Sequence, residues 1–133
     1  MASRLISDLD PRFQPIAQSF LDDCKQANID LLVTCTLRPP WEQQALYAQG
    51  RTMPGRIVTN AKAGQSAHNY GFAIDVVPMV AGKPDWDGSH PIWDLVGKAG
   101  ITRGLVWYGL PDAKFHEKPH FEFPGWESLV NGR

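Results

Sequence analysis

The chain contains 133 residues, of which 43% are hydrophobic and 20% are charged, and its formal net charge at pH 7 is -1. This composition is typical of one globular domain and excludes an intrinsically disordered chain. A net charge near zero gives no support for a nucleic-acid partner, and the N-terminal segment has no apolar run long enough for a secretory signal or a membrane span.

The first helix is predicted from a start signal and from apolar spacing. Asp10 can cap the free amides of a first turn, and Pro11 is tolerated at the first helical position. From Phe13 to Cys24 apolar residues recur every three or four positions, which places them on one face of a helix. We therefore expect a helix that begins at Asp10 and ends near Asn28.

A buried strand, a second helix and a long loop follow. Residues 29–37, IDLLVTCTL, are rich in β-branched and apolar side chains, and the strand that they predict leads Arg38 into a loop. Residues 41–49 are good helix formers, and Gly50 is a typical residue after a helix end. Residues 50–65 have no clear period and predict a surface loop of the kind that often carries function.

The second half of the chain predicts three more strands and one helix. Residues 72–77 predict a strand that ends at Pro78. Residues 91–100 predict a helix that opens with proline and closes with glycine. The segments GLVWYG (104–109) and HFEF (120–123) predict two short strands.

The connections between these elements decide the fold class. Helices and strands alternate only loosely, and the polar loop from Asp112 to Pro119 is too short for a crossover between parallel strands. We therefore expect an α+β fold in which helices flank a small, mostly antiparallel sheet. The sequence has no internal repeat and no linker, so we expect a single domain over residues 1–133.

Asp75 is unusual because it is a carboxylate inside an apolar strand. Side chains alternate across a sheet, so Asp75 lies on the face opposite to the bulky apolar residues. A carboxylate there is costly unless it is paired, hydrogen-bonded or bound to a metal ion. In an unbroken strand His68 would lie on the other face, but Gly71 permits a turn that brings it back, and Ser66 can fix that loop.

A second polar group lies in the segment HEKPHFEF, residues 116–123. Pro119 disfavours a helix at this point, so we expect His120 to begin a strand. In that strand His120 and Glu122 share the face that is opposite to the core-facing phenylalanines. Glu117 is expected in the loop just ahead of the strand.

Two histidines, one aspartate and a nearby carboxylate are the groups that hydrolytic zinc chemistry requires. Three protein ligands, here His68, Asp75 and His120, leave one coordination position for a water molecule, whose pKa zinc lowers to about 7. A carboxylate beside that water can accept its proton and pass it to the leaving amine. Glu117 is our candidate for this role, and Glu122 is the alternative, although its position better suits a residue that orients the His120 imidazole.

Each of these residues also has an ordinary interpretation. A lone histidine is more often a surface or capping residue than a ligand, so we assign such a role to His90 and expect His116 to be a loop residue. Arg38 can be a structural salt-bridge partner. Gln43 can contact a substrate through its amide or can be an exposed helix residue. The metal interpretation depends on the combination of groups.

The chain resembles the zinc D-alanyl-D-alanine carboxypeptidases and L-alanyl-D-glutamate endopeptidases, which share the pattern S-x-H-x-x-G-x-A-x-D and an acidic-x-x-His pair. The matching residues are Ser66, His68, Gly71, Ala73, Asp75, Glu117 and His120. The resemblance implies the D-Ala-D-Ala carboxypeptidase or Hedgehog-like zinc peptidase fold, the three zinc ligands named above and Glu117 as the catalytic acid and base.

Two further segments carry the resemblance. LRPPWEQQALYAQGRT is similar to the form common in phage endolysins, and it implies that Arg38 holds the substrate carbonyl and the developing oxyanion, with Gln43 following it. GLVWYG is similar to a GLxWGG stretch, but Tyr108 stands where glycine is usual. Glu117 also stands where the endopeptidases often have Asp, as in many dipeptidases and carboxypeptidases.

The resemblance implies a zinc peptidase that cleaves an amide bond in the stem peptide of bacterial peptidoglycan. The L-Ala-D-Glu bond is the expected target, as in an endolysin. The alternatives are a D-Ala-D-Ala carboxypeptidase or dipeptidase of the same fold, and a non-catalytic zinc-containing module that binds peptidoglycan. The intact Glu117 argues against the non-catalytic module.

The same reasoning gives expectations about location and assembly. We expect a monomer without a separate wall-binding domain, without membrane insertion and without a nucleic-acid partner. It would be made in the bacterial cytoplasm without a signal peptide and would act on the wall after release. Cys24 and Cys35 fit that origin, because we expect both to be reduced and buried.

Overall fold

An antiparallel sheet forms the centre of the computed structural model, which describes residues 1–110 and 117–131. Its strands within these ranges are β1 (Asp30–Cys35), β2 (Ala73–Val80), β3 (Lys83–Pro84), β4 (Val106–Tyr108) and β5 (Glu117–Glu122). They pair in the order β1-β2-β5-β4, and β3 pairs with the end of β2. The predicted α+β class with a small antiparallel sheet is confirmed.

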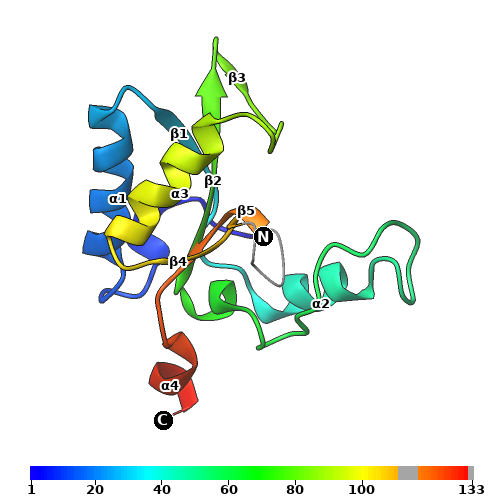
Figure 1. Ribbon diagram of the computed structural model, residues 1–133. Helices are drawn as coiled ribbons and strands as arrows, with labels where there is room; N and C mark the ends of the chain where they lie inside the picture. Colours follow the sequence, from blue (N-terminus) through cyan, green and yellow to red (C-terminus); the bar gives the residue numbers. More distant parts are fainter. Residues whose placement is uncertain (111–116, 132–133) are drawn as a thin grey trace.

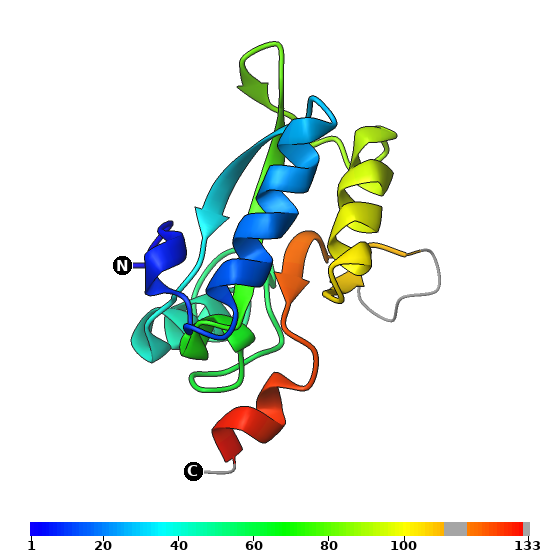
Figure 2. The same cartoon turned by 90° about the vertical axis from the view of Figure 1, so that its left-hand side faces the viewer.

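The helices lie on both sides of this sheet. They are the 3-10 helices η1 (Ile6–Asp8) and η2 (Ala67–Tyr70) and the α-helices α1 (Gln14–Gln26), α2 (Pro40–Ala48), α3 (Ile92–Thr102) and α4 (Trp126–Asn131). Helices α1 and α3 cover one face, whereas α2 and the long loop after it project on the other side (Figures 1 and 2). None of the described helices is both long and apolar enough to span a bilayer.

The core lies between the sheet and the pair of helices α1 and α3. Phe20 of α1 packs on Phe121 of β5 with 4.6 Å between ring centroids, and both side chains are buried. Gly100 lies inside α3, and a Cβ atom there would lie 2.5 Å from the Phe121 ring, so the position has no room for a side chain. The prediction that α3 ends by Gly100 is therefore wrong by two residues, and this glycine serves close packing.

Two other predicted boundaries were wrong because of local hydrogen bonds. Helix α1 begins at Gln14 and not at Asp10, since the Asp10 carboxylate accepts from the Arg12 amide (2.9 Å) in a turn before the helix. Strand β2 continues through Pro78. The Pro78 carbonyl accepts from the Asp85 amide (2.9 Å), away from β1, so the missing N–H costs no bond to β1.

Strand β5 begins at Glu117, three residues earlier than predicted. Glu117 pairs with Tyr108 after a register shift in β4, so Pro119 lies inside a strand at an irregular part of the ladder. Glu117 is therefore a strand residue and not a loop residue. Of the predicted loop from Asp112 to Pro119, residues 117–119 belong to β5, and residues 112–116, which include the predicted loop residue His116, lie outside the described residues.

Gly71 ends η2 in the left-handed conformation, with φ +74°, and turns the chain from His68 into β2. A Cβ atom at this position would lie 2.7 Å from the backbone nitrogen of Asp10, which itself donates to the Gly71 carbonyl. The predicted turn between His68 and Asp75 is thus made at a position that only glycine can occupy without strain.

Replacing Gly71 with alanine should lower the free energy of unfolding by about 2–4 kcal/mol, from left-handed strain and from the clash with the Asp10 backbone. Gly82→Ala is the matched control, because Gly82 also has a positive φ (+76°) but has no atom within 4 Å of a Cβ. The control should lose about 1 kcal/mol. Denaturant unfolding measures both, and equal losses would show that the contact with Asp10 is unimportant.

Candidate active site

A cleft of about 930 Å³ is lined in part by Leu46 of α2 and by the long loop that follows this helix. Residues of η2, β2, β5, α4 and the loop line it. The predicted ligands His68, Asp75 and His120 all contribute to the lining, together with Arg38, Glu117 and Glu122. The fold thus brings residues from both halves of the sequence to one place.

Asp75 is the centre of this group. Its Oδ1 atom lies 3.0 Å from His68 Nε2 and 3.0 Å from His120 Nδ1. His120 is the residue opposite Asp75 in the pairing of β2 with β5, which brings the two side chains together on one face. His68 reaches the same carboxylate from η2, after the turn at Gly71.

The ring nitrogen of each histidine that points away from Asp75 has its own hydrogen-bond partner. His68 Nδ1 lies 2.8 Å from the Thr36 carbonyl oxygen, which can only accept, so Nδ1 carries a proton. His120 Nε2 lies 2.7 Å from Glu122 Oε1. The nitrogens that face Asp75 are therefore Nε2 of His68 and Nδ1 of His120, each oriented by a carbonyl or a carboxylate behind it, as metal-binding imidazoles usually are.

These contacts shift the pKa of each partner strongly. Burial alone would lower the pKa of His68, but the charge and hydrogen bond of Asp75 outweigh it and raise the pKa to about 9. Burial alone would also lower the pKa of His120, but its hydrogen bonds with Asp75 and Glu122 outweigh this effect and raise the pKa to about 10. Burial would raise the pKa of Asp75, but the two imidazoles hold it well below its ordinary range.

Cys35 lies closer to this group than its sequence position indicated. Both Cys24 and Cys35 are free and buried, as predicted. The Cys35 sulfur lies 3.6 Å from His68 Nδ1, and atoms of Cys35, His68 and Asp75 that can bind a metal ion lie within 4.8 Å of one another. Because His68 Nδ1 is engaged with Thr36, the nitrogen that is left to bind a metal ion, Nε2, faces Asp75 and not the thiol.

Arg38 follows β1 and enters the cleft beside Asp75. Its Nη2 atom lies 3.9 Å from Asp75 Oδ2 and donates to the Cys35 sulfur at 3.4 Å. Its Nε atom is buried without a hydrogen-bond partner among the described residues, although Glu42 Oε2 lies 3.9 Å away. The guanidinium is thus fixed in the cleft, and its Nη atoms carry N–H groups beyond the one that binds the Cys35 sulfur.

Gln43 is fully buried, so its interpretation as an exposed helix residue is wrong. Its Oε1 atom accepts from Arg38 Nη1 at 2.9 Å, and its Nε2 atom donates to the Ala61 carbonyl at 2.9 Å. Gln43 therefore connects Arg38 to the loop that forms one wall of the cleft, behind the lining residues.

Backbone contacts join the segment of Arg38 to that of His68. The Arg38 amide donates to the His68 carbonyl at 2.8 Å, and Asn69 Nδ2 donates to the Arg38 carbonyl at 3.0 Å. Ser66 caps η2, because its hydroxyl accepts from the His68 amide while its own amide donates to Asn69 Oδ1. The predicted loop-fixing role of Ser66 is therefore seen directly.

Glu117 and Tyr108 lie opposite each other at the start of β5 and the end of β4, and both line the cleft. The Tyr108 ring stacks on His120 at 6.3 Å between centroids. Burial, together with the charges of Glu122, Glu127 and Glu117, raises the pKa of Tyr108, so its hydroxyl keeps its proton. Glu117 is exposed at the start of β5.

Some lining residues could not be found from the sequence. Trp126 and Glu127 line the cleft from α4, and no spacing in the sequence relates them to the histidines. The Thr36 carbonyl that orients His68 is a backbone group and leaves no signature in a sequence. Cys35 lies opposite Asp75 only after a register shift between Val33 and Cys35, which the alternation along a strand does not predict.

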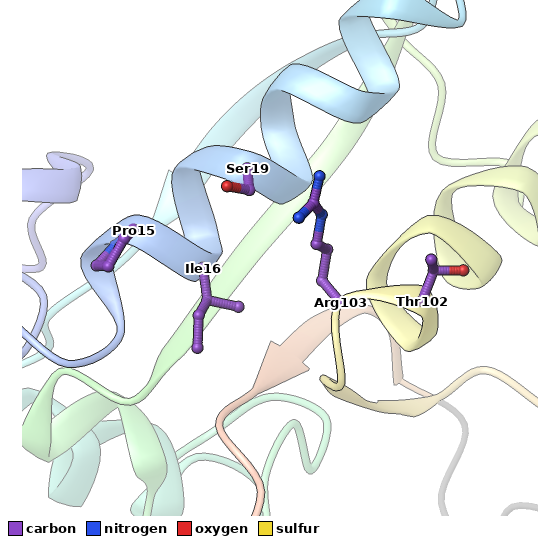
Figure 3. A pocket seen from close by; sticks show the side chains of 5 residues that line it. All are labelled: Pro15, Ile16, Ser19, Thr102 and Arg103. Carbon is purple, nitrogen blue, oxygen red and sulfur yellow. The ribbon is translucent and has the colours of Figure 1, made fainter.

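A second hollow, of about 350 Å³, lies between α1 and the C-terminal end of α3. Figure 3 shows Arg103 extending from the end of α3 toward α1. Arg103 is already paired with Asp23 at 2.6 and 2.9 Å. None of the residues that line this hollow is a His, Cys, Asp or Glu, so the cleft is the candidate active site among the described residues.

Comparison with known proteins gives this site a family. Two family models described as D-alanyl-D-alanine carboxypeptidase match residues 7–88 and 59–123. The peptidoglycan L-alanyl-D-glutamate endopeptidase CwlK of Bacillus subtilis (strain 168) is 36% identical over 124 residues, which are 87% of this chain and 74% of that protein.

Solved structures share the fold. The L-Ala D-Glu endopeptidase ChiX of Serratia marcescens is 19% identical, with a TM-score of 0.62 over 96% of this chain and 91% of that one. A variant of the vancomycin-resistance D,D-pentapeptidase VanY in complex with Zn(II) is 17% identical, with a TM-score of 0.64 over 98% and 82%. With the family models and the CwlK relative, the chain belongs to the D-alanyl-D-alanine carboxypeptidase family.

Proposed function

We propose that the chain is a zinc peptidase that hydrolyses the L-Ala-D-Glu bond in the stem peptide of peptidoglycan. The observation that carries the proposal is the convergence of His68 Nε2 and His120 Nδ1 on Asp75 Oδ1, each at 3.0 Å. The 36% identity to an L-alanyl-D-glutamate endopeptidase supports this bond over others.

The residues present fit a zinc ion. Two imidazole nitrogens and one carboxylate oxygen are a ligand set that catalytic zinc accepts, and it leaves one position open. The partners behind the imidazoles, the Thr36 carbonyl and Glu122, fix the ring orientation in advance. Zinc, when bound, supplies a Lewis acid that polarises the scissile carbonyl and makes water a stronger nucleophile.

The chain's own side chains account for the remaining steps. Glu117, exposed at the start of β5, accepts a proton from the attacking water and delivers it to the leaving amine. Arg38, whose guanidinium enters the cleft beside Asp75, donates through its Nη atoms to the carbonyl oxygen as negative charge develops on it. Gln43 and the Arg38–His68 backbone bond hold that guanidinium in place. These steps involve no covalent intermediate.

Mass spectrometry of digested muropeptides tests the scissile bond. The proposal expects new amino termini on D-Glu and new carboxyl termini on L-Ala, and loss of both products with a zinc chelator. The descriptions of the family models favour a second candidate, a D-alanyl-D-alanine carboxypeptidase. Release of terminal D-Ala with no cleavage at D-Glu would establish that candidate and reject ours.

We extend the proposal to the setting in which the enzyme acts. The chain would work as a monomeric catalytic domain and lyse the wall in the manner of an endolysin, after release from the bacterial cytoplasm. Loss of turbidity of purified cell walls on addition of the protein measures lysis, and sedimentation measures the oligomeric state. Cleavage of muropeptides without wall lysis would restrict the activity to soluble fragments.

Replacing Arg38 with alanine should lower kcat/KM by about 10²–10³-fold, because the oxyanion loses a charged donor in the cleft. Zinc should remain bound, since the ligand set is unchanged. Arg103→Ala is the control, because Arg103 also pairs with an aspartate but lies away from the cleft. Steady-state kinetics on a defined muropeptide decide, and equal activity of the two variants would assign Arg38 a purely structural role.

A further inference from the structure

We propose that Trp126 is a positioning residue that orients Glu122, and through it His120, for binding the metal ion. The inference rests on the proposed zinc site and adds a residue from the C-terminal helix to it. Trp126 is 7% exposed and begins α4, the last described element.

The first support is a continuous set of hydrogen bonds. Trp126 Nε1 donates to Glu122 Oε2 at 3.0 Å, while Glu122 Oε1 lies 2.7 Å from His120 Nε2. Each oxygen of the Glu122 carboxylate therefore has its own partner, which fixes the plane of the carboxylate. His120 Nδ1, on the far side of the ring, faces Asp75 at 3.0 Å. A rotation of Glu122 would change where that nitrogen points.

The second support is the packing of the indole ring. It stacks on Tyr70 with 5.6 Å between centroids and 29° between planes. Tyr70 ends the same 3-10 helix that carries His68, and its hydroxyl donates to the Gly64 carbonyl at 2.8 Å. The one side chain of Trp126 thus contacts both segments that supply histidines, η2 through Tyr70 and β5 through Glu122.

Tryptophan suits this place for a chemical reason. Its indole has one N–H donor and no acceptor, so it can bind an ionised carboxylate without competing for the proton on His120. Phenylalanine would keep the stacking surface and lose only the donor. The Glu122 carboxylate would then lose the donor that holds its Oε2 atom and could turn toward the open cleft.

The predicted consequence is a loss of zinc affinity that depends on Glu122. Removing an outer partner of a metal-binding histidine costs about 10–100-fold in affinity, so Glu122→Ala should fall in that range. Trp126→Phe acts one bond further away and should lose about 3–10-fold. In the Glu122→Ala background, Trp126→Phe should cause no further loss, because the group that it positions is absent.

Chelator competition on the full chain measures zinc affinity for the four proteins of this cycle. Trp93→Phe is the control, since Trp93 is a buried tryptophan whose Nε1 has no partner among the described residues. That variant should lose stability and keep its zinc affinity. An equal loss from Trp126→Phe in both backgrounds, or no loss in either, would overturn the proposal.

The wild-type chain supplies a second test that needs no variant to fold. The indole N–H resonance of Trp126 should shift when zinc is titrated in, whereas that of Trp93 should not. An unchanged Trp126 resonance on zinc binding would also overturn the inference. If the wild-type chain binds no zinc, the proposed function fails instead, so the two failures are distinguishable.

Discussion

Replacing Glu117 with glutamine should reduce the rate of stem-peptide cleavage by about 10²–10⁴-fold, the contribution typical of a positioned general acid and base. The amide keeps the size of the side chain but cannot take up a proton at neutral pH. Glu117 lines the cleft and is not among the three residues that we propose as ligands, so zinc affinity should not change. Single-turnover kinetics with a defined muropeptide, together with the metal content, measure both effects.

The matched control for this variant is Glu127→Gln. Glu127 is an exposed glutamate that lines the same cleft, so the control removes one negative charge at a similar place. It should retain nearly full activity. Undiminished cleavage by the Glu117 variant would reject its role and would point to Glu122 as the proton acceptor. Loss of activity together with loss of zinc would show that Glu117 supports the metal site itself.

The affinity for zinc should rise steeply as the pH increases from about 7 to about 9, the range that the raised histidine pKa values define. Before zinc binds, the pKa values of His68 and His120 are raised from 6.5 to about 9 and about 10. At pH 7 both imidazoles are therefore protonated, and zinc must displace a proton from each. Every displaced proton contributes about a tenfold change in affinity per pH unit.

Titration calorimetry in buffers of different ionisation enthalpy counts these protons directly. Release of close to two protons per zinc at pH 7 is the expected result, and a smaller number is expected at pH 9. Glu122→Gln is the control, because the pKa of His120 is raised partly by Glu122 and should fall without that charge. Its pH dependence should be shallower. A wild-type affinity that does not change over this range would contradict the prediction.

The family and the fold were predicted correctly from the sequence, because the informative residues are close together in the chain. The segment from Ser66 to Asp75 contains a cap, a histidine, a turn glycine and a strand carboxylate, and each has a local physical signature. The alternation that placed His120 and Glu122 on one face depends only on the period of a strand. Such features do not require knowledge of tertiary contacts.

The boundaries and the outer partners were less predictable, since they depend on contacts between distant segments. Gly100 resembles a helix end until the Phe121 ring that packs on it is known. Pro119 resembles a strand breaker until the register shift in β4 is known. Gln43 lies on a short helix with little apolar pattern, so its burial follows from the loop that covers it. The roles of the individual site residues remain predictions for the experiments above.

The direct bond between the Arg38 amide and the His68 carbonyl has a consequence for how this cleft can diversify. Peptide groups fix the spacing between the cation and the first histidine, and side-chain identity does not affect such bonds. The 50–65 loop starts after α2 and returns at η2, so it lies between Arg38 and His68 in the sequence. Insertions or substitutions in that loop can therefore reshape one wall of the cleft while the spacing between the Arg38 and His68 backbones stays constant.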